Sequence, residues 1–363
     1  MGVISDGGRV LSVFGSTHFM DHESVHFGFD ESSGLRSIVA IHSTALGPSL
    51  GGTRFYPYIS DSDALTDVLR LSRSMSHKAA LAGLDQGGGK AVIIGDPRQL
   101  ASTSLFEKYG DFINGLCGRY ITAADVGTTV ANMVTVATRT PFVKGLPMED
   151  GGSGDPSPAT ARGVVAAIKA VAAQCWNTDD LAGRTVAIKG VGKVGYDLAE
   201  LLTDLGASLI VADVNSAATD RAERELGAAV AAVDSIRTVK CDIFAPCALG
   251  GDLNSSSIAL LNCEAVVGSA NNQLATQRDA DRLKNRGILY APDFLVNAGG
   301  IINIAAETGG YTIEKSNGMV DNIYNTLLNI LDTADRRDVN PHVAALEVAQ
   351  QRIDTARKQG DNS

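Results

Sequence analysis

Three glycines, which we expect to form a loop, run directly into a lysine at Gly87-Gly88-Gly89-Lys90, ahead of the apolar stretch AVIIG. The phosphate-binding P-loop requires Ser or Thr after its lysine, and Ala91 stands there instead. A role in phosphate binding is therefore disfavoured. Lys78 lies twelve residues earlier, at the end of a segment of helical periodicity, and Asp125 lies in a third short loop. Lys78, Lys90 and Asp125 together suggest acid–base chemistry.

Two lysines that face one crevice would repel each other as ammonium ions, and burial would further favour a neutral amine. One amine could then act as a base near neutral pH, while the other stays charged and binds a carboxylate. Asp125 could carry protons between them and a substrate. The spacing alone leaves open the alternative of solvated surface lysines and a capping aspartate.

A second motif follows the strand-like sequence TVAIK and opens a helical segment, GVGKVG. Its glycines allow a tight turn and let backbone N–H groups approach a pyrophosphate at the helix N-terminus. Asp213 ends the next strand, 18 residues after the last glycine, where a carboxylate would bind a ribose 2′-OH and repel a 2′-phosphate. The motif predicts a site for NAD rather than NADP, formed by Gly190, Gly192, Lys193, Val194, Gly195 and Asp213. The alternatives are a glycine turn without a ligand and an aspartate that merely ends a strand.

The segments around these motifs alternate between strand and helix patterns, as in an α/β protein. The first part is expected to contain a strand at 35–45, a glycine-rich turn at 47–54, a helix at 61–83, a strand at 91–95 and a helix at 103–116. A Gly-, Pro-, Ser- and Asp-rich connection at 145–158 separates it from the second part. That part is expected to run helix, strand, tight turn, helix, strand, then short strands in CDIFAP, EAVVGSA and GILYAP, and helices from about 319.

The composition fits a two-domain globular protein of 363 residues with a formal charge of −10. This charge argues against nucleic acid or an anionic membrane as the main partner. Five cysteines without C-x-x-C spacing suggest reduced thiols, and six scattered histidines suggest no metal site. The N-terminal MGVISDGGRVLSVFG lacks the basic and apolar regions of a signal peptide. We therefore expect a soluble cytoplasmic protein.

Several long stretches resemble segments of the amino-acid dehydrogenases that act on glutamate, leucine, phenylalanine and valine, with the leucine and valine enzymes most similar. They are RSIVAIHSTALGPSLGGTRFYPY, MSHKAALAGLDQGGGKAVIIGDP, YITAADVGTTV, APCALGG, GSANNQLA and GILYAPDFLVNAGGIIN. The resemblance covers about residues 20–355. It implies a substrate and oligomerisation domain at 1–147, joined by C-terminal helices at about 331–363. A Rossmann NAD-binding domain would occupy 148–330, with the active site in a cleft.

The resemblance also implies residue roles. Lys78 would bind the substrate carboxylate, Lys90 would activate the water that attacks an imine, and Asp125 would transfer protons to and from nitrogen. Asn297 would hold the substrate or the nicotinamide ribose region, and the Gly51-Gly52 backbone would approach the substrate closely. Near the nicotinamide side the resemblance places Thr160, Cys247, Ala248, Asn271 and Asn272. The implied reaction is reversible oxidative deamination to a 2-oxo acid and ammonia.

Four aliphatic residues are expected to line the pocket for the substrate side chain: Leu50, Ala123, Leu327 and Ile330. They favour valine, leucine or isoleucine, with an aromatic substrate as the alternative and a non-catalytic dinucleotide-binding regulator as a remote one. The sequence departs from the family pattern at His77, Val134 and Arg162. The family further implies a homo-oligomer, whose subunit number the sequence does not give.

Overall fold

The structure is a computed structural model that describes residues 13–360. Most of the N-terminal stretch inspected for a signal peptide lies outside the described residues. The chain forms two compact units. The first unit comprises the residues up to Ser76 together with Asp85–Leu146, and the second comprises His77–Leu84 together with the residues from Pro147 onward.

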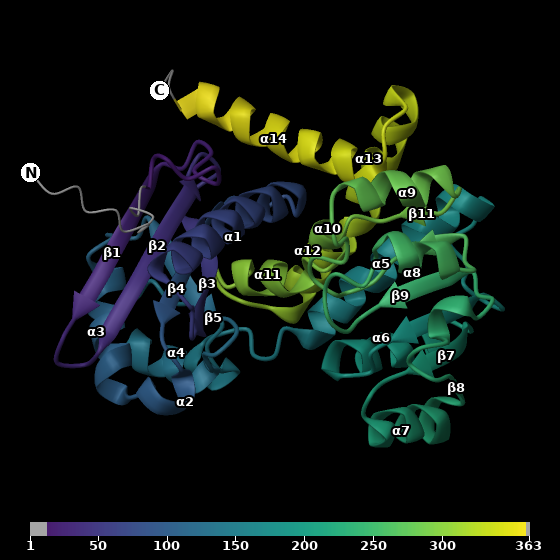
Figure 1. Cartoon of the computed structure of the whole chain (residues 1–363), viewed down its shortest axis with the longest axis horizontal. Coiled ribbons are helices and arrows are strands. Elements are labelled where there is room, and N and C mark those ends of the chain that lie inside the picture. Colours follow the sequence, from purple (N-terminus) through teal and green to yellow (C-terminus); the bar gives the residue numbers. More distant parts are fainter. Residues whose placement is uncertain (1–12, 361–363) are drawn as a thin grey trace, which may run out of the picture. The chain divides into compact units, whose positions relative to one another are not determined.

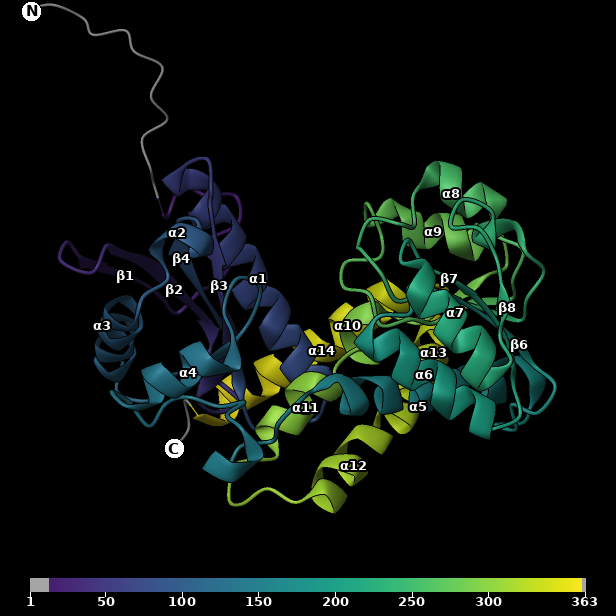
Figure 2. The same ribbon diagram turned by 90° about the horizontal axis from the view of Figure 1, so that it is seen from below.

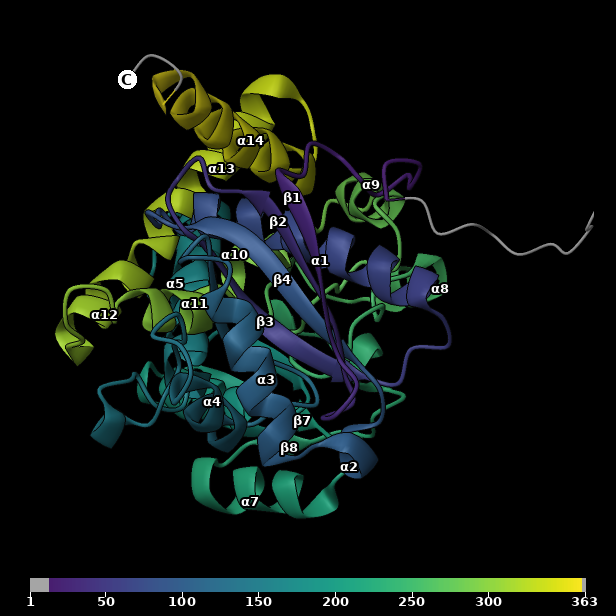
Figure 3. The same cartoon turned by 90° about the vertical axis from the view of Figure 1, so that its left-hand side faces the viewer.

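The first unit is built on a five-stranded sheet of order β1-β2-β4-β3-β5 (Figures 1 and 3). β1 and β2 are antiparallel, β2 and β4 are antiparallel, and β3 runs parallel to both β4 and β5. The strands are β1 (Ser24–Asp30), β2 (Leu35–Ser43), β3 (Ser49–Tyr56), β4 (Gly87–Ile94) and β5 (Tyr120–Ala124). The helices are α1 (Asp61–Leu81), α2 (Pro97–Leu100), α3 (Thr103–Asn114) and α4 (Val130–Ala137).

Helices cover both faces of this sheet, because alternate side chains of β2 and β4 point to opposite sides. Ile38, Ala40 and Val92 pack with Leu65, Val68 and Leu69 of α1. Val39, Ile41, Ala91 and Ile93 pack on the other face with residues of α3 and α4. Lys90 and Val92 share the face that α1 covers, since they are two residues apart in one strand. The lysine is thereby directed toward the side of the sheet on which α1 lies.

Two glycine-rich segments that we expected to be loops or turns are strands. Gly87, Gly88 and Gly89 belong to β4, and the stretch expected as a turn at 47–54 supplies most of β3. Glycine is unfavourable in strands in general, but here its missing side chain makes room. A Cβ on Gly87 would lie 1.9 Å from the Ser43 carbonyl oxygen, and one on Gly88 would lie 2.0 Å from the Ser76 nitrogen. The glycines therefore permit close packing inside the sheet and are not a flexible loop.

The second unit contains a six-stranded parallel sheet of order β11-β10-β9-β6-β7-β8. This is the doubly wound order of a Rossmann fold, with β6 as the first strand and the crossover between β6 and β9. The predicted α/β class and Rossmann fold are confirmed. The strands are β6 (Thr185–Lys189), β7 (Ser208–Ala212), β8 (Ala229–Val230), β9 (Ile243–Pro246), β10 (Ala265–Val266) and β11 (Leu289–Tyr290).

Helices surround this sheet, and α5 and α6 lie side by side (Figure 2). Among residues 13–360, no helix combines the length and the apolar character needed to cross a membrane. The helices are α5 (Ser157–Trp176), α6 (Lys193–Asp204), α7 (Ser216–Leu226), α8 (Ser255–Leu260), α9 (Arg278–Asn285), α10 (Asp293–Val296), α11 (Gly299–Ala305), α12 (Ile313–Asp321), α13 (Ile323–Arg337) and α14 (Pro341–Gly360). Short 3₁₀ turns are η1 (Met148–Asp150) and η2 (Ile236–Thr238).

The C-terminal helices belong to the second compact unit, and their expected packing on the first domain stays a prediction. Within this unit, α14 contacts the C-terminal end of α1 and the residues that follow it. Arg352 of α14 donates hydrogen bonds to the carbonyl oxygens of Ala80 and Leu84, at 2.8 Å each. A guanidinium at a helix C-terminus satisfies carbonyls that have no partner within the helix. Arg352 thereby holds residues 77–84 against α14 within the second unit.

Candidate active site

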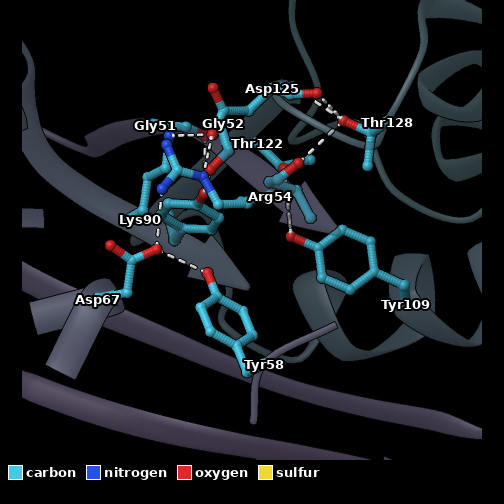
Figure 4. Close-up of polar contacts among 12 residues, drawn as sticks. Gly51, Gly52, Arg54, Tyr58, Asp67, Lys90, Tyr109, Thr122, Asp125 and Thr128 are labelled. Atoms are coloured by element: carbon cyan, nitrogen blue, oxygen red, sulfur yellow. Dashed lines mark hydrogen bonds and ion pairs between the residues drawn. The ribbon is translucent and has the colours of Figure 1, made fainter. Parts of the chain in front are cut away.

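Lys90 and Asp125 form a close ion pair on the first unit (Figure 4). Lys90 Nζ lies 2.7 Å from Asp125 Oδ2, and the side chains are 7% and 24% exposed. Burial alone would raise the pKa of Asp125, but the charges of Lys90 and Arg54 outweigh it and lower the pKa. Asp125 is therefore a carboxylate at neutral pH. Two ionisable groups at this distance can exchange a proton directly.

Hydroxyl groups fix the backbone that carries Asp125 (Figure 4). The Asp125 N–H donates to Thr128 Oγ1 at 2.9 Å, and the Thr128 hydroxyl lies 2.9 Å from the Thr53 carbonyl oxygen. The Thr53 hydroxyl lies 2.6 Å from Thr122 Oγ1 and 2.5 Å from Tyr109 Oη. These contacts join β3 to β5 through the buried hydroxyl groups of Thr53 and Thr122. The position of Asp125 is thus set by the sheet itself.

The backbone of Gly51 and Gly52 is packed against protein atoms. A Cβ on Gly51 would lie 1.9 Å from the Gly89 carbonyl oxygen, and one on Gly52 would lie 2.8 Å from Asp125 Cβ. Tyr120 donates its hydroxyl to the Gly51 carbonyl at 2.7 Å. We had attributed the absence of side chains here to the approach of a substrate. The described contacts give a sufficient reason within the protein, and the substrate role stays a prediction.

Lys78 and Asn297 are brought together within the second unit. Lys78 Nζ donates to Asn297 Oδ1 at 2.6 Å. The Asn297 amide in turn donates to Asn271 Oδ1 at 2.8 Å and to the Ser269 carbonyl at 3.2 Å. Asn297 therefore connects the lysine to the loop that follows β10. The structure pairs Lys90 with Asp125 and Lys78 with Asn297, and the shared crevice of the two lysines stays a prediction.

The glycine motif of the second unit fits a dinucleotide, with a different physical role for each glycine. Gly190 has a φ of +102°, in the region that glycine tolerates best. A Cβ on Gly195 would lie 2.0 Å from the Gly190 carbonyl oxygen, so this glycine lets α6 pack against the turn. A Cβ on Gly192, at the N-cap of α6, would meet nothing within 4 Å. The turn thus leaves space where a pyrophosphate would approach the helix N-terminus.

Asp213 lies at the end of β7 and also holds the glycine turn. Its Oδ2 accepts from the Val191 N–H at 2.8 Å, and its Oδ1 accepts from the Asn215 N–H at 2.8 Å. Each carboxylate oxygen has further lone pairs, so both bonds are compatible with a ribose hydroxyl as a third partner. The sequence pattern had not predicted the tether to Val191.

The other residues predicted near the cofactor have the following contacts and conformations. Ala248 and Cys247 contact the position that a Gly190 side chain would occupy. Burial raises the pKa of the Cys247 thiol, as expected for an unreactive packed cysteine. Lys193 reaches Asp155 at 3.1 Å on the surface, the Thr160 hydroxyl donates to the Pro156 carbonyl, and Asn272 adopts a positive φ of 51°. Val194 belongs to the first turn of α6. Their contacts with a cofactor stay predictions.

The four predicted pocket residues are buried in their own units. Leu50 and Ala123 lie on β3 and β5, 1% and 4% exposed, and Leu327 and Ile330 lie on α13 with no exposed surface. Such burial suits core packing as well as a closed pocket wall. The departures from the family pattern also have contacts: His77 with Gln350, and Arg162 with both carboxylate oxygens of Asp321. Val134 lies largely exposed on α4.

Sequence reasoning missed Arg54 and Asp67, two polar residues near Asp125. Arg54 contacts Asp125 and Asp67, and Tyr58 donates to Asp67. Arg54 lies two residues after the Gly51-Gly52 pair that was singled out, and this proximity was the available signal. Nothing in the sequence distinguished Asp67 as a site residue, because it is one of the regularly spaced polar residues of α1.

Comparisons with known proteins agree with this arrangement. The profile of the Glu/Leu/Phe/Val dehydrogenase dimerisation domain matches residues 22–141. The glutamate/leucine/phenylalanine/valine dehydrogenase profile matches residues 151–223 and 211–360. The chain belongs to this family. It is an amino-acid dehydrogenase, and such enzymes depend on a dinucleotide.

Individual relatives match over nearly their whole length. Leucine dehydrogenase of Geobacillus stearothermophilus is 47% identical over 348 residues, covering 96% of this chain and 95% of the relative. Valine dehydrogenase of Streptomyces virginiae is 46% identical over 356 residues, covering 97% and 99%. The crystal structure of L-tryptophan dehydrogenase from Nostoc punctiforme superposes with a TM-score of 0.86 at 40% identity, covering 95% of this chain and 100% of that one.

Proposed function

We propose that this dehydrogenase catalyses the reversible, NAD-dependent oxidative deamination of a branched-chain L-amino acid, giving the 2-oxo acid and ammonia. The observation that carries the proposed chemistry is the buried pair of Lys90 and Asp125, in a protein that also has a dinucleotide turn. An amine and a carboxylate in direct contact can pass a proton between them, which suits a reaction that must move protons at both water and nitrogen.

The proposed roles divide between the two pairs of residues. Lys78, positioned by Asn297, binds the substrate α-carboxylate as a cation. NAD, when bound, accepts the α-hydrogen of the substrate as hydride, which leaves an iminium. Lys90, in its neutral amine form, takes a proton from the water that adds to this iminium carbon. Asp125 takes and returns protons at the nitrogen, so that ammonia leaves as the carbinolamine collapses to the 2-oxo acid.

NAD is favoured over NADP by Asp213. Its carboxylate lies at the end of β7, where a ribose 2′-OH would be bound in this fold, and a 2′-phosphate there would face a negative charge. This repulsion of a 2′-phosphate favours NAD over NADP.

Branched-chain substrates are favoured by two arguments. The predicted pocket residues Leu50, Ala123, Leu327 and Ile330 are all aliphatic. The leucine and valine dehydrogenases are 46–47% identical to this chain. An aromatic substrate is the second candidate, because a solved tryptophan dehydrogenase is 40% identical and shares the fold over 95% of the chain.

The deciding experiment is a panel of steady-state rates of NADH formation with L-valine, L-leucine, L-isoleucine, L-phenylalanine and L-tryptophan. D-Leucine serves as the stereochemical control. We expect kcat/KM for the best branched-chain substrate to exceed that for the aromatic ones by at least ~10-fold, as for apolar pockets that discriminate by size. The reverse order would favour the aromatic alternative. NADH binding without turnover of any of these amino acids would overturn the proposed function.

The family resemblance and the matched dimerisation domain further support an assembly of more than one subunit. The protein's five cysteines, all free thiols, support a reducing compartment such as the cytoplasm. Light scattering coupled to size-exclusion chromatography measures the subunit number directly.

A further inference from the structure

Arg54 lies between two carboxylates and joins the proposed proton-transfer pair to α1 (Figure 4). Its Nε is 3.3 Å from Asp125 Oδ2, and its Nη1 is 2.9 Å from Asp67 Oδ2. The three side chains are each only about one quarter exposed, at 25%, 25% and 24% for Arg54, Asp67 and Asp125. Because two different nitrogens are engaged, the guanidinium plane is held at both ends.

A tyrosine fixes the far end of this chain of contacts. Tyr58 donates its hydroxyl to Asp67 Oδ2 at 2.7 Å. Burial and the contact with Asp67 raise the pKa of Tyr58 well above its usual range, so the phenol stays protonated and remains a donor. Asp67 Oδ2 therefore accepts from both Tyr58 and Arg54. The order of contacts is Tyr58, Asp67, Arg54, Asp125 and Lys90.

Arg54 and Lys90 both reach the same oxygen of Asp125, Oδ2. Two cations at one oxygen fix the direction in which the carboxylate points, and they favour its ionised form. The groups that contact Asp125 or act on its charge are Lys90 from β4, Arg54 from β3, Tyr120 from β5, and Thr128 and Val126 from its own loop. Among these groups, Arg54 is the one cation that also contacts a second carboxylate, that of Asp67.

We propose that Arg54 is a positioning residue, anchored by Asp67 and Tyr58, that orients the Asp125 carboxylate for proton transfer at the substrate nitrogen. This inference rests on the proposed function and adds a residue to it. The alternative is that Arg54 has only a structural role and holds β3 against α1 through its ion pair with Asp67. The two differ in what they predict for turnover and its pH dependence in a protein that remains folded.

The surroundings of Arg54 offer a way to separate the two. A cavity of about 540 Å³ opens beside it, lined by Arg54, Tyr56, Tyr58, Asp67 and Val126 among others. Truncating Arg54 to alanine leaves the guanidinium position connected to this cavity. A free guanidinium ion can then enter and contact both carboxylates. Rescue by a small cation would restore the orientation of Asp125 without restoring the covalent link between β3 and the guanidinium group.

The experiment measures NADH formation by Arg54→Ala with the best substrate of the panel, with and without millimolar guanidinium chloride at constant ionic strength. We expect kcat to fall by ~10- to 100-fold, in the range of effects from misplaced catalytic groups. Added guanidinium should raise the kcat of Arg54→Ala at least several-fold, and this rise should saturate as the guanidinium concentration increases. Asp125→Asn must show no rescue, since the group that guanidinium would orient has lost its charge. Arg98→Ala is the matched control, because Arg98 is exposed and pairs only locally with Asp96.

The pH profile gives an independent readout. Removing one cation from Asp125 raises the pKa of its carboxyl, so the acidic limb of kcat/KM should move to higher pH in Arg54→Ala. Arg54→Lys should show a smaller shift in the same direction, and Asp67→Asn, which removes the anchor of Arg54, should lower kcat; both variants keep the test valid if Arg54→Ala does not fold. An unshifted profile and normal kcat in the folded variants would overturn the inference, as would a loss of kcat that guanidinium leaves unchanged.

Failure of this inference is distinguishable from failure of the proposed function. If the wild-type chain oxidises no amino acid, the proposed function falls. If the wild type is active and Lys90→Ala and Asp125→Asn are not, while Arg54→Ala behaves as wild type, only the role of Arg54 falls.

Discussion

Lys90 Nζ lies 2.7 Å from Asp125 Oδ2, and the lysine is only 7% exposed. Lys90 comes from the middle of a central strand and Asp125 from the loop after an edge strand, so the pair is created by the sheet register. Glycines at 87–89 and at 51–52 allow these strands and α1 to approach closely enough. The contact between the two groups therefore depends on residues that carry no side chain.

Replacing Lys90 by alanine should abolish most turnover while leaving cofactor binding intact. The amine is the proposed base, and loss of such a group costs ~10²- to 10⁴-fold in rate. Stopped-flow or steady-state NADH formation measures kcat, and NADH fluorescence titration measures binding. Lys108→Ala is the control, since that lysine is 46% exposed on α3. Turnover within twofold of wild type would remove Lys90 from the mechanism.

Replacing Asp125 by asparagine should destabilise the protein in a pH-dependent way. The variant leaves the buried Lys90 ammonium without its counter-ion, and breaking a buried pair costs ~3–5 kcal/mol. The folded-state pKa of Asp125 is lowered below the ordinary value of 3.8. Its contribution is thus fully present above that value and is lost as the pH falls through the lower folded-state pKa.

Chemical unfolding of wild type and Asp125→Asn at several pH values between 3 and 8 tests this. The difference in unfolding free energy should be constant from about pH 6 to 8 and should shrink on acidification below the ordinary carboxyl pKa of ~3.9. A difference that grows toward acidic pH would contradict the ion pair.

The sequence predicted the Rossmann motif well because its information is local. The glycines at 190, 192 and 195, the strand before them and the acidic residue after the next strand all lie within about thirty residues, a span typical of this motif. The assignment of Gly87–Gly89 to a loop was wrong because propensity describes a residue alone. In β4 the backbone atoms of Ser43 and Ser76, which belong to other elements, leave no room for a side chain at Gly87 and Gly88. The Arg54–Asp67 pair was missed for the same reason, since it joins β3 to α1.

Exchanging Asp213 for asparagine should weaken the preference for NAD. Asparagine keeps an acceptor for the Val191 N–H but loses the charge that repels a 2′-phosphate. We expect the ratio of kcat/KM for NAD to that for NADP to fall by at least ~10-fold, which corresponds to about 1.4 kcal/mol. Asp213→Ala removes the turn contact as well and should also lower the affinity for both cofactors. An unchanged ratio in both variants would show that Asp213 only ends its strand and holds the turn.

Alanine at Gly192 and at Gly195 should have different consequences for the stability of the cofactor-free protein. A Cβ at 195 would lie 2.0 Å from the Gly190 carbonyl oxygen, and such overpacking costs ~1–3 kcal/mol or more. A Cβ at 192 meets nothing within 4 Å, so Gly192→Ala should change the unfolding free energy by less than ~1 kcal/mol, through the N-cap preference alone.

That same Cβ projects into the space left for the pyrophosphate. Gly192→Ala should therefore keep its melting temperature without NADH and lose most of the stabilisation that NADH gives to the wild type, as measured by thermal unfolding with and without cofactor. A Gly192→Ala protein with normal stabilisation by NADH would mean that the pyrophosphate binds elsewhere.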